Sequence, residues 1–224
     1  MGYEAPRPSS EDYDDREPLP AGSEIISTSG LHYKIKDEPV GFGGSALIYR
    51  VSRAGSLRNF VIKECYPLSR DFKFSRDADK GIVRPDSAEV EAKQYFDMVK
   101  DNMNRENTIG QLIANQTGRA VSTWENLEVG KIIINGRDFD AKGSHFIVLE
   151  EATGSEERGW FLKDLLRECA KPARDDAPLR TAGLPAPQVV TSIMEELLKA
   201  LRDIHRAGYI HGDINDSNFF FNGL

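Results

Sequence analysis

The first part of the chain alternates apolar and polar residues in short runs, a pattern that predicts β-strands. Two such runs, LHYKIKDEPV (31–40) and ALIYRV (46–51), flank a cluster of glycines. The run FVIKECY (60–66) is denser in β-branched residues, which favours a more buried strand. Asn135-Gly136 separates two further strand-like runs and indicates a β-hairpin. The run SHFIVLE (144–150) predicts another buried strand.

Two longer segments repeat apolar residues at helical spacing instead. Residues 85–117 form the first, with Asp86 as the expected N-cap and Glu89 completing a capping box, although the polar run KDNMNREN allows it to divide into two helices. The second begins near Pro187 and ends at Gly208. One face of this helix is expected to carry Val190, Ile193, Leu197, Leu201 and Ile204.

These patterns divide the chain into three parts. Residues 1–23 are rich in acids and proline and poor in large apolar side chains, so we expect a disordered lead. Residues 24–150 are β-rich with one long helix. Residues 151–224 are mainly helical, and WFLKDLLREC (160–169) within them predicts a short amphipathic helix.

Composition then excludes several classes of protein. Hydrophobic residues make up 39% and charged residues 29% of the chain, values typical of a soluble globular protein. A net charge of −7 argues against a nucleic-acid partner, and no apolar run is long enough for a membrane segment. The four histidines and the cysteines Cys65 and Cys169 lack zinc-site spacing. The N-terminus does not resemble a signal peptide, so we expect a cytoplasmic protein.

Two features of the β-rich part suggest an anion site. Gly41, Gly43 and Gly44 lie between two predicted strands, where backbone amides can approach a phosphate without obstruction by a Cβ. A glycine-rich hairpin without any ligand has the same pattern. Lys63 lies within an apolar strand and either needs an anionic partner or extends from an edge strand to water.

The stretch HGDINDSNFFF (211–221) adds a third feature. Asp213 and Asn218 are five residues apart, in a loop between a helix and a buried strand. An aspartate in such a loop can orient or deprotonate a hydroxyl, and an asparagine can offer a carbonyl oxygen to Mg²⁺. Ordinary turn chemistry accounts for either residue alone, but the order of the three features favours a shared site.

Taken together, these motifs resemble those of the protein kinase family. GFGGSALIYRV is similar to the Gly-rich loop G-x-G-x-x-G-x-V, with Ala46 in place of the third glycine and Ile48 in place of the valine. FVIK resembles V-A-I-K, and HGDINDSN resembles H-R-D-L-x-x-x-N. The resemblance covers residues 31–224 and implies an α+β, bilobal kinase-like fold. Residues 24–150 would then form the N-lobe, and residues 151–224 the hinge and a partial C-lobe.

The resemblance also implies ATP and Mg²⁺ as cofactors and assigns roles to particular residues. The catalytic residues would be Lys63, Asp213 and a glutamate on the first helix, for which Glu106 is our choice and Glu91 the alternative. Asn218 would bind the metal. The nucleotide would be bound by Gly41, Gly43, Gly44, Ser45, Ile48, Val61, Lys63, the gatekeeper Leu149, and the hinge residues Glu150 and Ala152.

The sequence departs from the family pattern at three points. Gly212 replaces the arginine of the catalytic loop, and Asn215 replaces the lysine that serine/threonine kinases direct at the γ-phosphate. No D-F-G motif follows the FFFNG strand. We therefore expect a kinase domain truncated before D-F-G, which in full-length form transfers the ATP γ-phosphate to serine or threonine of an unidentified protein.

Two alternatives remain open at this stage. HGD followed by Asn218 also resembles the aminoglycoside and choline phosphotransferases, which act on small molecules, although the Gly-rich loop and the V-x-K strand favour a protein kinase. The neutral Asn215 and the missing metal-binding aspartate also fit a catalytically dead pseudokinase that serves as an interaction module.

Overall fold

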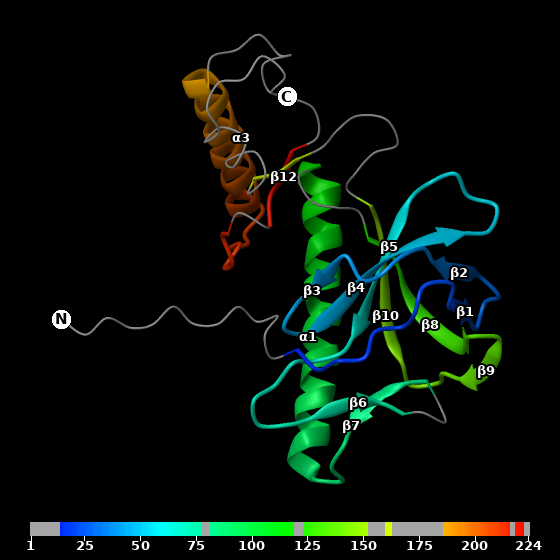
Figure 1. Ribbon diagram of the computed structural model, residues 1–224. Helices are drawn as coiled ribbons and strands as arrows, with labels where there is room; N and C mark the ends of the chain where they lie inside the picture. Colours follow the sequence, from blue (N-terminus) through cyan, green and yellow to red (C-terminus); the bar gives the residue numbers. More distant parts are fainter. Residues whose placement is uncertain are drawn as a thin grey trace. The chain divides into compact units, whose positions relative to one another are not determined.

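The computed structural model describes residues 14–77, 81–118, 123–151, 160–162, 186–215 and 218–221 (Figure 1). The chain divides into two units. The first unit comprises residues 1–108 and 123–150, and the second comprises residues 109–122 and 151–224.

Strands predominate among the elements of the described part. In chain order they are β1 (Glu24–Ser27), β2 (His32–Ile35), β3 (Gly41–Phe42), β4 (Ala46–Arg53), β5 (Phe60–Cys65), β6 (Phe74–Arg76), β7 (Val83–Pro85), β8 (Thr123–Ile134), β9 (Arg137–Asp140), β10 (His145–Glu150), β11 (Trp160–Phe161) and β12 (Phe220–Phe221). The helices are α1 (Val90–Thr117), between β7 and β8, and α3 (Ala186–Arg206), between β11 and β12.

Eight of the described strands form one antiparallel sheet. Its order is β1-β2-β4-β5-β10-β8-β9, with β3 paired to β4. Because β1 also pairs with β8, the sheet closes on itself. A closed sheet has an inner and an outer face, and successive side chains along each strand alternate between the two.

The inner face of this sheet is the hydrophobic core of the first unit. Leu47, Tyr49 and Val51 of β4 are fully buried, as are Phe60 and Ile62 of β5. The alternation predicted within 46–51 is thus observed directly, and the strand predicted over 60–66 is β5. Each such buried side chain contributes roughly 1.5–3 kcal/mol relative to an exposed one, so this face supplies much of the driving force for folding.

The same alternation directs the Glu64 carboxylate into the core, where it is 2% exposed. Arg76 of β6 donates hydrogen bonds of 2.8 Å to both carboxylate oxygens of Glu64, and the Tyr49 hydroxyl donates another of 2.8 Å to Glu64. Burial and the Glu64 charge raise the pKa of Tyr49 far above its usual range, so this hydroxyl remains a donor. The charge of Glu64 is therefore fully paired.

The expectation of a disordered lead over residues 1–23 is wrong for residues 14–23, which pack on the sheet; residues 1–13 lie outside the described part. Leu19 is fully buried, and its N–H donates to the Tyr49 hydroxyl at 3.1 Å. The N–H of Glu17 donates to the Tyr66 hydroxyl at 3.2 Å, and its carbonyl accepts from Arg76 at 3.2 Å. These specific contacts order a segment whose composition alone favours disorder. We call residues 14–19 the strap.

A buried ion pair lies inside the strap. The Arg16 side chain is 2% exposed and that of Asp14 is 7% exposed. Arg16 Nε donates to Asp14 Oδ1 at 2.7 Å, and a second nitrogen of the guanidinium donates to Oδ2. These hydrogen bonds lower the pKa of Asp14 below its ordinary value.

Helix α1 begins at Val90, four residues later than the predicted N-cap Asp86. The Asp86 carboxylate instead accepts from the Ser75 hydroxyl, so Asp86 does not cap the helix. α1 is one continuous helix of 28 residues despite its polar centre, and it ends at Gly118, which has a φ of 65°. Its buried residues are Ala92, Phe96, Val99, Met103 and Asn107.

The predicted β8–β9 hairpin is confirmed, since Asn135 and Gly136 have φ values of 51° and 77°, as a type I′ turn requires. In the second unit, the buried residues of α3 include Ile193, Leu197 and Ile204 of the predicted face. The helix predicted over 160–169 is wrong at its start, because Trp160–Phe161 is strand β11 and pairs with β12; residues 163–169 lie outside the described part.

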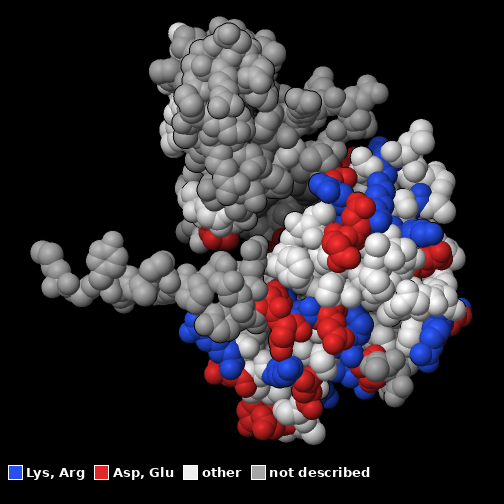
Figure 2. Space-filling model, in the orientation of Figure 1, with Lys and Arg blue, Asp and Glu red and all other residues white. Residues whose placement is uncertain are grey.

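Charged side chains of both signs lie interspersed on the face of the first unit in view (Figure 2). Within the described residues, no helix combines the length and the apolar character needed to cross a bilayer.

Replacing Arg76 tests the buried pair. Arg76→Leu leaves the Glu64 charge without its main partner and is expected to reduce the free energy of unfolding by about 3–5 kcal/mol. The double variant Glu64→Leu/Arg76→Leu should recover more than half of this loss, because no charge is then buried. Urea denaturation measures both. As a control, Lys131→Ala breaks the exposed Lys131–Asp138 pair (2.7 Å) and should cost less than about 1 kcal/mol. Equal losses for Arg76→Leu and Lys131→Ala would contradict the assignment.

Asp14 gives the strap a predictable pH dependence. The pKa of Asp14 is lower in the folded than in the unfolded chain. Its contribution to the stability of the fold is therefore complete above the ordinary carboxyl pKa, and it is lost as the pH falls through the lower pKa of the folded state. The unsubstituted chain should exceed Asp14→Asn in free energy of unfolding by about 1–3 kcal/mol at pH 7. This difference should be constant down to about pH 5 and shrink below about pH 4. Urea denaturation at stepped pH measures it, with the exposed Asp37→Asn as control; a difference that grows on acidification would refute the ion pair.

Candidate functional site

The Gly-rich segment forms a tight hairpin between β3 and β4. Its turn is closed by a hydrogen bond of 2.9 Å from the Gly43 N–H to the Ala46 carbonyl, which leaves Gly44 and Ser45 as the two central residues. The Gly44 carbonyl accepts from the Leu68 N–H at 2.8 Å. Within the described part of the chain, the N–H groups of Gly44 and Ser45 donate to no protein acceptor. The turn therefore presents two adjacent backbone donors, the arrangement that binds an anion.

One row of cross-strand partners connects this hairpin with Lys63. Gly41 of β3 is paired with Ile48 of β4, and Ile48 with Lys63 of β5. The row continues from Lys63 to Ile147 of β10 and then to Asn126 of β8. Directly paired residues of an antiparallel sheet project from the same face, and here it is the outer face, opposite Glu64.

A second pair lies next to this row on the same face. Val61 of β5 is paired with Leu149 of β10, two residues along each strand from the row of Lys63. Ile48, Val61, Lys63 and Leu149 are all half-buried. The structure thus places on one face Lys63 and three apolar side chains that the resemblance assigns to a nucleotide site.

The remaining predicted binding residues are the hinge residues Glu150 and Ala152. Glu150, at the end of β10, forms an ion pair of 3.5 Å with Arg58, and both side chains are largely exposed. Lys63 takes part in no ion pair with any described residue. Ala152 lies outside the described residues.

Helix α1 contacts the end of the row of Lys63 through Asn107. The Asn107 side-chain amide donates to the Asn126 carbonyl oxygen at 2.5 Å, and Asn126 is the last member of that row. Glu106, the next residue on the helix, is exposed. Glu91 is also exposed and lies 16 residues before Asn107, about 24 Å along the helix axis. Of the two candidate glutamates, Glu106 is therefore the one next to the helix residue that contacts the end of this row.

The loop after α3 in the second unit brings its polar residues together. Asn218 Nδ2 donates to the Asp213 carboxylate at 2.7 Å and to the Asp213 carbonyl at 3.0 Å. Asn215 Nδ2 donates to the other carboxylate oxygen at 3.0 Å. The His211 ring stacks on Phe219 with 5.1 Å between the ring centroids, and its Nδ1 accepts from the Asp213 N–H at 3.4 Å. The Asp213 carboxylate is thus oriented by two amides while remaining exposed to solvent.

The donor set of this loop suits magnesium better than zinc. Because Asn218 uses its nitrogen to bond Asp213, its carbonyl oxygen Oδ1 is free to act as a ligand. Mg²⁺ in nucleotide sites takes one or two protein oxygens and completes its shell with phosphates and water. The described residues hold no group of three or more His, Cys, Asp or Glu side chains able to enclose a metal ion. The loop therefore fits a metal ion that arrives with a nucleotide.

Sequence patterns did not identify Glu64, Arg76 or Arg16, although all three lie close to the candidate site. The alternation of β5 could have revealed the buried position of Glu64, since Phe60 and Ile62 point the same way. No sequence signal indicates its partner Arg76. Arg16 reaches across 27 residues of sequence to the Gly43 carbonyl, at 2.9 Å.

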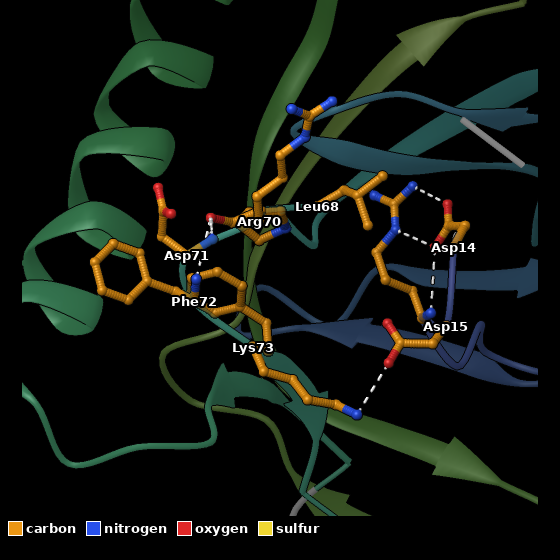
Figure 3. A pocket seen from close by; sticks show the side chains of 11 residues that line it. Asp14, Asp15, Leu68, Arg70, Asp71, Phe72 and Lys73 are labelled. Carbon is orange, nitrogen blue, oxygen red and sulfur yellow. Dashed lines mark hydrogen bonds and ion pairs between the residues drawn. The ribbon is translucent and has the colours of Figure 1, made fainter. Parts of the chain in front are cut away.

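A cavity of about 510 Å³ opens between the strap and the segment after β5 (Figure 3). Residues 14–16 and 67–74 line it, and Lys63 is not among them. Lys73 and Asp15, which both line the cavity, form an ion pair of 2.9 Å, so its wall carries charges of both signs. It adjoins the Gly-rich turn through Leu68, whose N–H bonds the Gly44 carbonyl.

Comparison with known proteins supports the fold. No family model and no curated protein sequence matches the chain. The solved structures similar to it include the apo form of PpkA-294, a bacterial serine/threonine protein kinase domain, with a TM-score of 0.56, 20% identity and coverage of 90% of this chain. They also include the PknI kinase domain of Mycobacterium tuberculosis, with a TM-score of 0.44, 16% identity and coverage of 93%.

The chain spans 56% of the length of the PpkA-294 structure and 60% of that of PknI. At 20% identity, the likeness to PpkA-294 establishes the fold alone. The β-rich unit with a long helix therefore has a protein-kinase-like fold, and this part of the expectation from sequence is confirmed.

Proposed function

We propose that this chain is an ATP-binding protein kinase domain, in which residues 24–150 form the N-lobe and residues 151–224 the hinge and the first part of the C-lobe. The activity proposed for its full-length form is transfer of the ATP γ-phosphate to serine or threonine of a protein. The observation that carries the proposal is the cross-strand row Gly41–Ile48–Lys63, which begins at the Gly-rich hairpin.

The chemistry of that face matches the parts of a nucleotide. The free N–H groups of Gly44 and Ser45 suit phosphate oxygens, and the Lys63 ammonium, on the strand paired with β4, would add a positive charge. Val61, Leu149 and Ile48 offer a half-buried apolar surface for the planar base. An otherwise unpaired lysine next to exposed backbone donors is explained by an anionic ligand.

The loop after α3 would supply the transfer chemistry. Asp213 would accept the proton of the attacking hydroxyl, and its orientation by Asn215 and Asn218 supports this role. When bound with the nucleotide, Mg²⁺ would neutralise phosphate charge, and Asn218 Oδ1 would be one of its ligands.

A second candidate function is nucleotide binding without transfer, as in a pseudokinase. Asn215, at the position of the family's catalytic-loop lysine, is neutral and bonds the Asp213 carboxylate. It cannot place a positive charge on the γ-phosphate, so transfer would lack one stabilising group.

Binding of Mg-ATP tests the proposal. At an ATP concentration about 100 times its Kd, the free energy of unfolding should rise by about 2.7 kcal/mol, which a thermal shift detects. Lys63→Met should abolish the shift and leave the stability of the free protein almost unchanged, because its ammonium has no partner among the described residues. Lys34→Met, an exposed change on β2, is the matched control and should retain the shift.

Transfer of labelled γ-phosphate, measured with a longer chain that extends past residue 224, then separates the alternatives. Label on a protein substrate, lost in Asp213→Ala, supports the kinase. Label on an aminoglycoside would instead support a phosphotransferase that acts on a small molecule. ATP binding without transfer would favour the pseudokinase, and a chain that never binds ATP would overturn the proposal altogether.

The partner of Lys63 is tested by two matched substitutions on α1. Glu106→Gln should raise the Kd for Mg-ATP about tenfold, because Glu106 would orient the Lys63 ammonium toward the phosphates. Glu91→Gln, about 24 Å along the helix from Asn107, should change it by less than about twofold. Isothermal titration calorimetry measures both, and the reverse order of effects would move the assignment to Glu91.

A further inference from the structure

We propose that Arg16 is a positioning residue that fixes the Gly-rich turn for phosphate binding, and that the strap thereby controls the affinity for the phosphates of a nucleotide. This inference rests on the proposed function, since it assigns the Gly-rich turn to the phosphates. It concerns residues of the first unit alone.

The contacts of Arg16 join three segments. One nitrogen of its guanidinium, Nη1, donates to the Gly43 carbonyl at 2.9 Å and to the Tyr66 carbonyl at 2.6 Å. The Tyr66 N–H in turn donates to the Ser45 carbonyl at 3.1 Å. Arg16 and Tyr66 therefore hold the turn at both ends, at Gly43 and at Ser45.

The planarity of the peptide bond converts these contacts into control of the free donors. In a trans peptide, the carbonyl of one residue and the N–H of the next point in opposite directions. The bond from Arg16 to the Gly43 carbonyl therefore sets the direction of the Gly44 N–H. In the same way, the bond from Leu68 to the Gly44 carbonyl sets the direction of the Ser45 N–H. Both donors proposed for phosphate are thus fixed through the carbonyl that precedes them.

The Gly43–Gly44 peptide needs this restraint more than the next one. Glycine adopts positive and negative φ about equally well, so a peptide between two glycines can rotate at low cost. The Gly44 carbonyl is held by the backbone of Leu68, whereas the Gly43 carbonyl is held by the Arg16 side chain. Losing Arg16 would therefore release one of the two donors and leave the other in place.

Arginine is suited to this position for reasons of charge and geometry. Its side chain is 2% exposed, and the Asp14 carboxylate neutralises it inside the strap. The remaining donors of the fork are then free to reach two carbonyls at once, which a lysine ammonium does less well. The strap itself is held separately, through Leu19 and the backbone of Glu17.

Affinities for Mg-ATP and adenosine, measured on the full 224-residue chain by calorimetry, test the proposal. Arg16→Gln should raise the Kd for Mg-ATP about tenfold, because about one hydrogen bond to a charged group is lost. The Kd for adenosine should change by less than about twofold. Lys73→Gln, which breaks the exposed Lys73–Asp15 pair of the same strap, is the control and should change neither. Unchanged ATP affinity in Arg16→Gln, or equal weakening of ATP and adenosine, would overturn the proposal.

A second measurement needs no nucleotide. The NMR backbone order parameter of Gly44 should fall from about 0.85 to below about 0.6 in Arg16→Gln, with that of Val129 on β8 unchanged. If Arg16→Gln does not fold, Arg16→Lys, which keeps the charge without the fork, takes its place with the same expected results. If the unsubstituted chain binds no ATP, the proposed function fails, yet the Gly44 order parameter still decides the role of Arg16: an unchanged value refutes it.

Discussion

A carboxylate enclosed by a closed sheet has to be neutralised, and the Glu64 side chain thereby determines where two other segments of the first unit lie. Arg76 satisfies it from β6, which brings the β6–β7 hairpin against the sheet. The same guanidinium bonds the Glu17 carbonyl, so the strap is attached to the same charge. Tyr49 bonds both Glu64 and the backbone of Leu19. Because an unpaired buried charge costs several kcal/mol, these attachments depend on one another.

The alternation of β5 connects this core charge with the candidate site. Glu64 faces the interior and Lys63 the outer face, so one step along the strand separates the charge that organises the fold from the charge proposed to hold a ligand. Tyr66, two residues further, links the strap to the Gly-rich turn. Stability and the geometry of the proposed phosphate site are therefore properties of the same short segment, residues 63–66, and a substitution in it is expected to affect both.

The features that follow from local patterns could be predicted from the sequence. The alternating strands, the Asn135-Gly136 turn, the buried face of α3 and the shared location of Ile48 and Lys63 all rest on short-range periodicity or on motif order. Contacts distant in sequence could not be predicted. Arg16 bonds Tyr66 across 50 residues, and the Asp86 carboxylate is engaged by Ser75 instead of capping α1. The strap was expected to be disordered because its composition offers few large apolar side chains to bury. A few hydrogen bonds and one buried leucine hold it instead.

The closure of the main sheet restricts how other proteins can recognise the first unit. Of the described strands in this sheet, β3 and β9 alone have a neighbour on one side only, and they are two and four residues long. β9 reads Arg-Asp-Phe-Asp, and such charges discourage a foreign strand from pairing with it. Strand addition, a common way to recruit an extended peptide, therefore has little template in this sheet. Recognition at this sheet falls to side chains and loops, which change readily in evolution without disturbing the strands that support them.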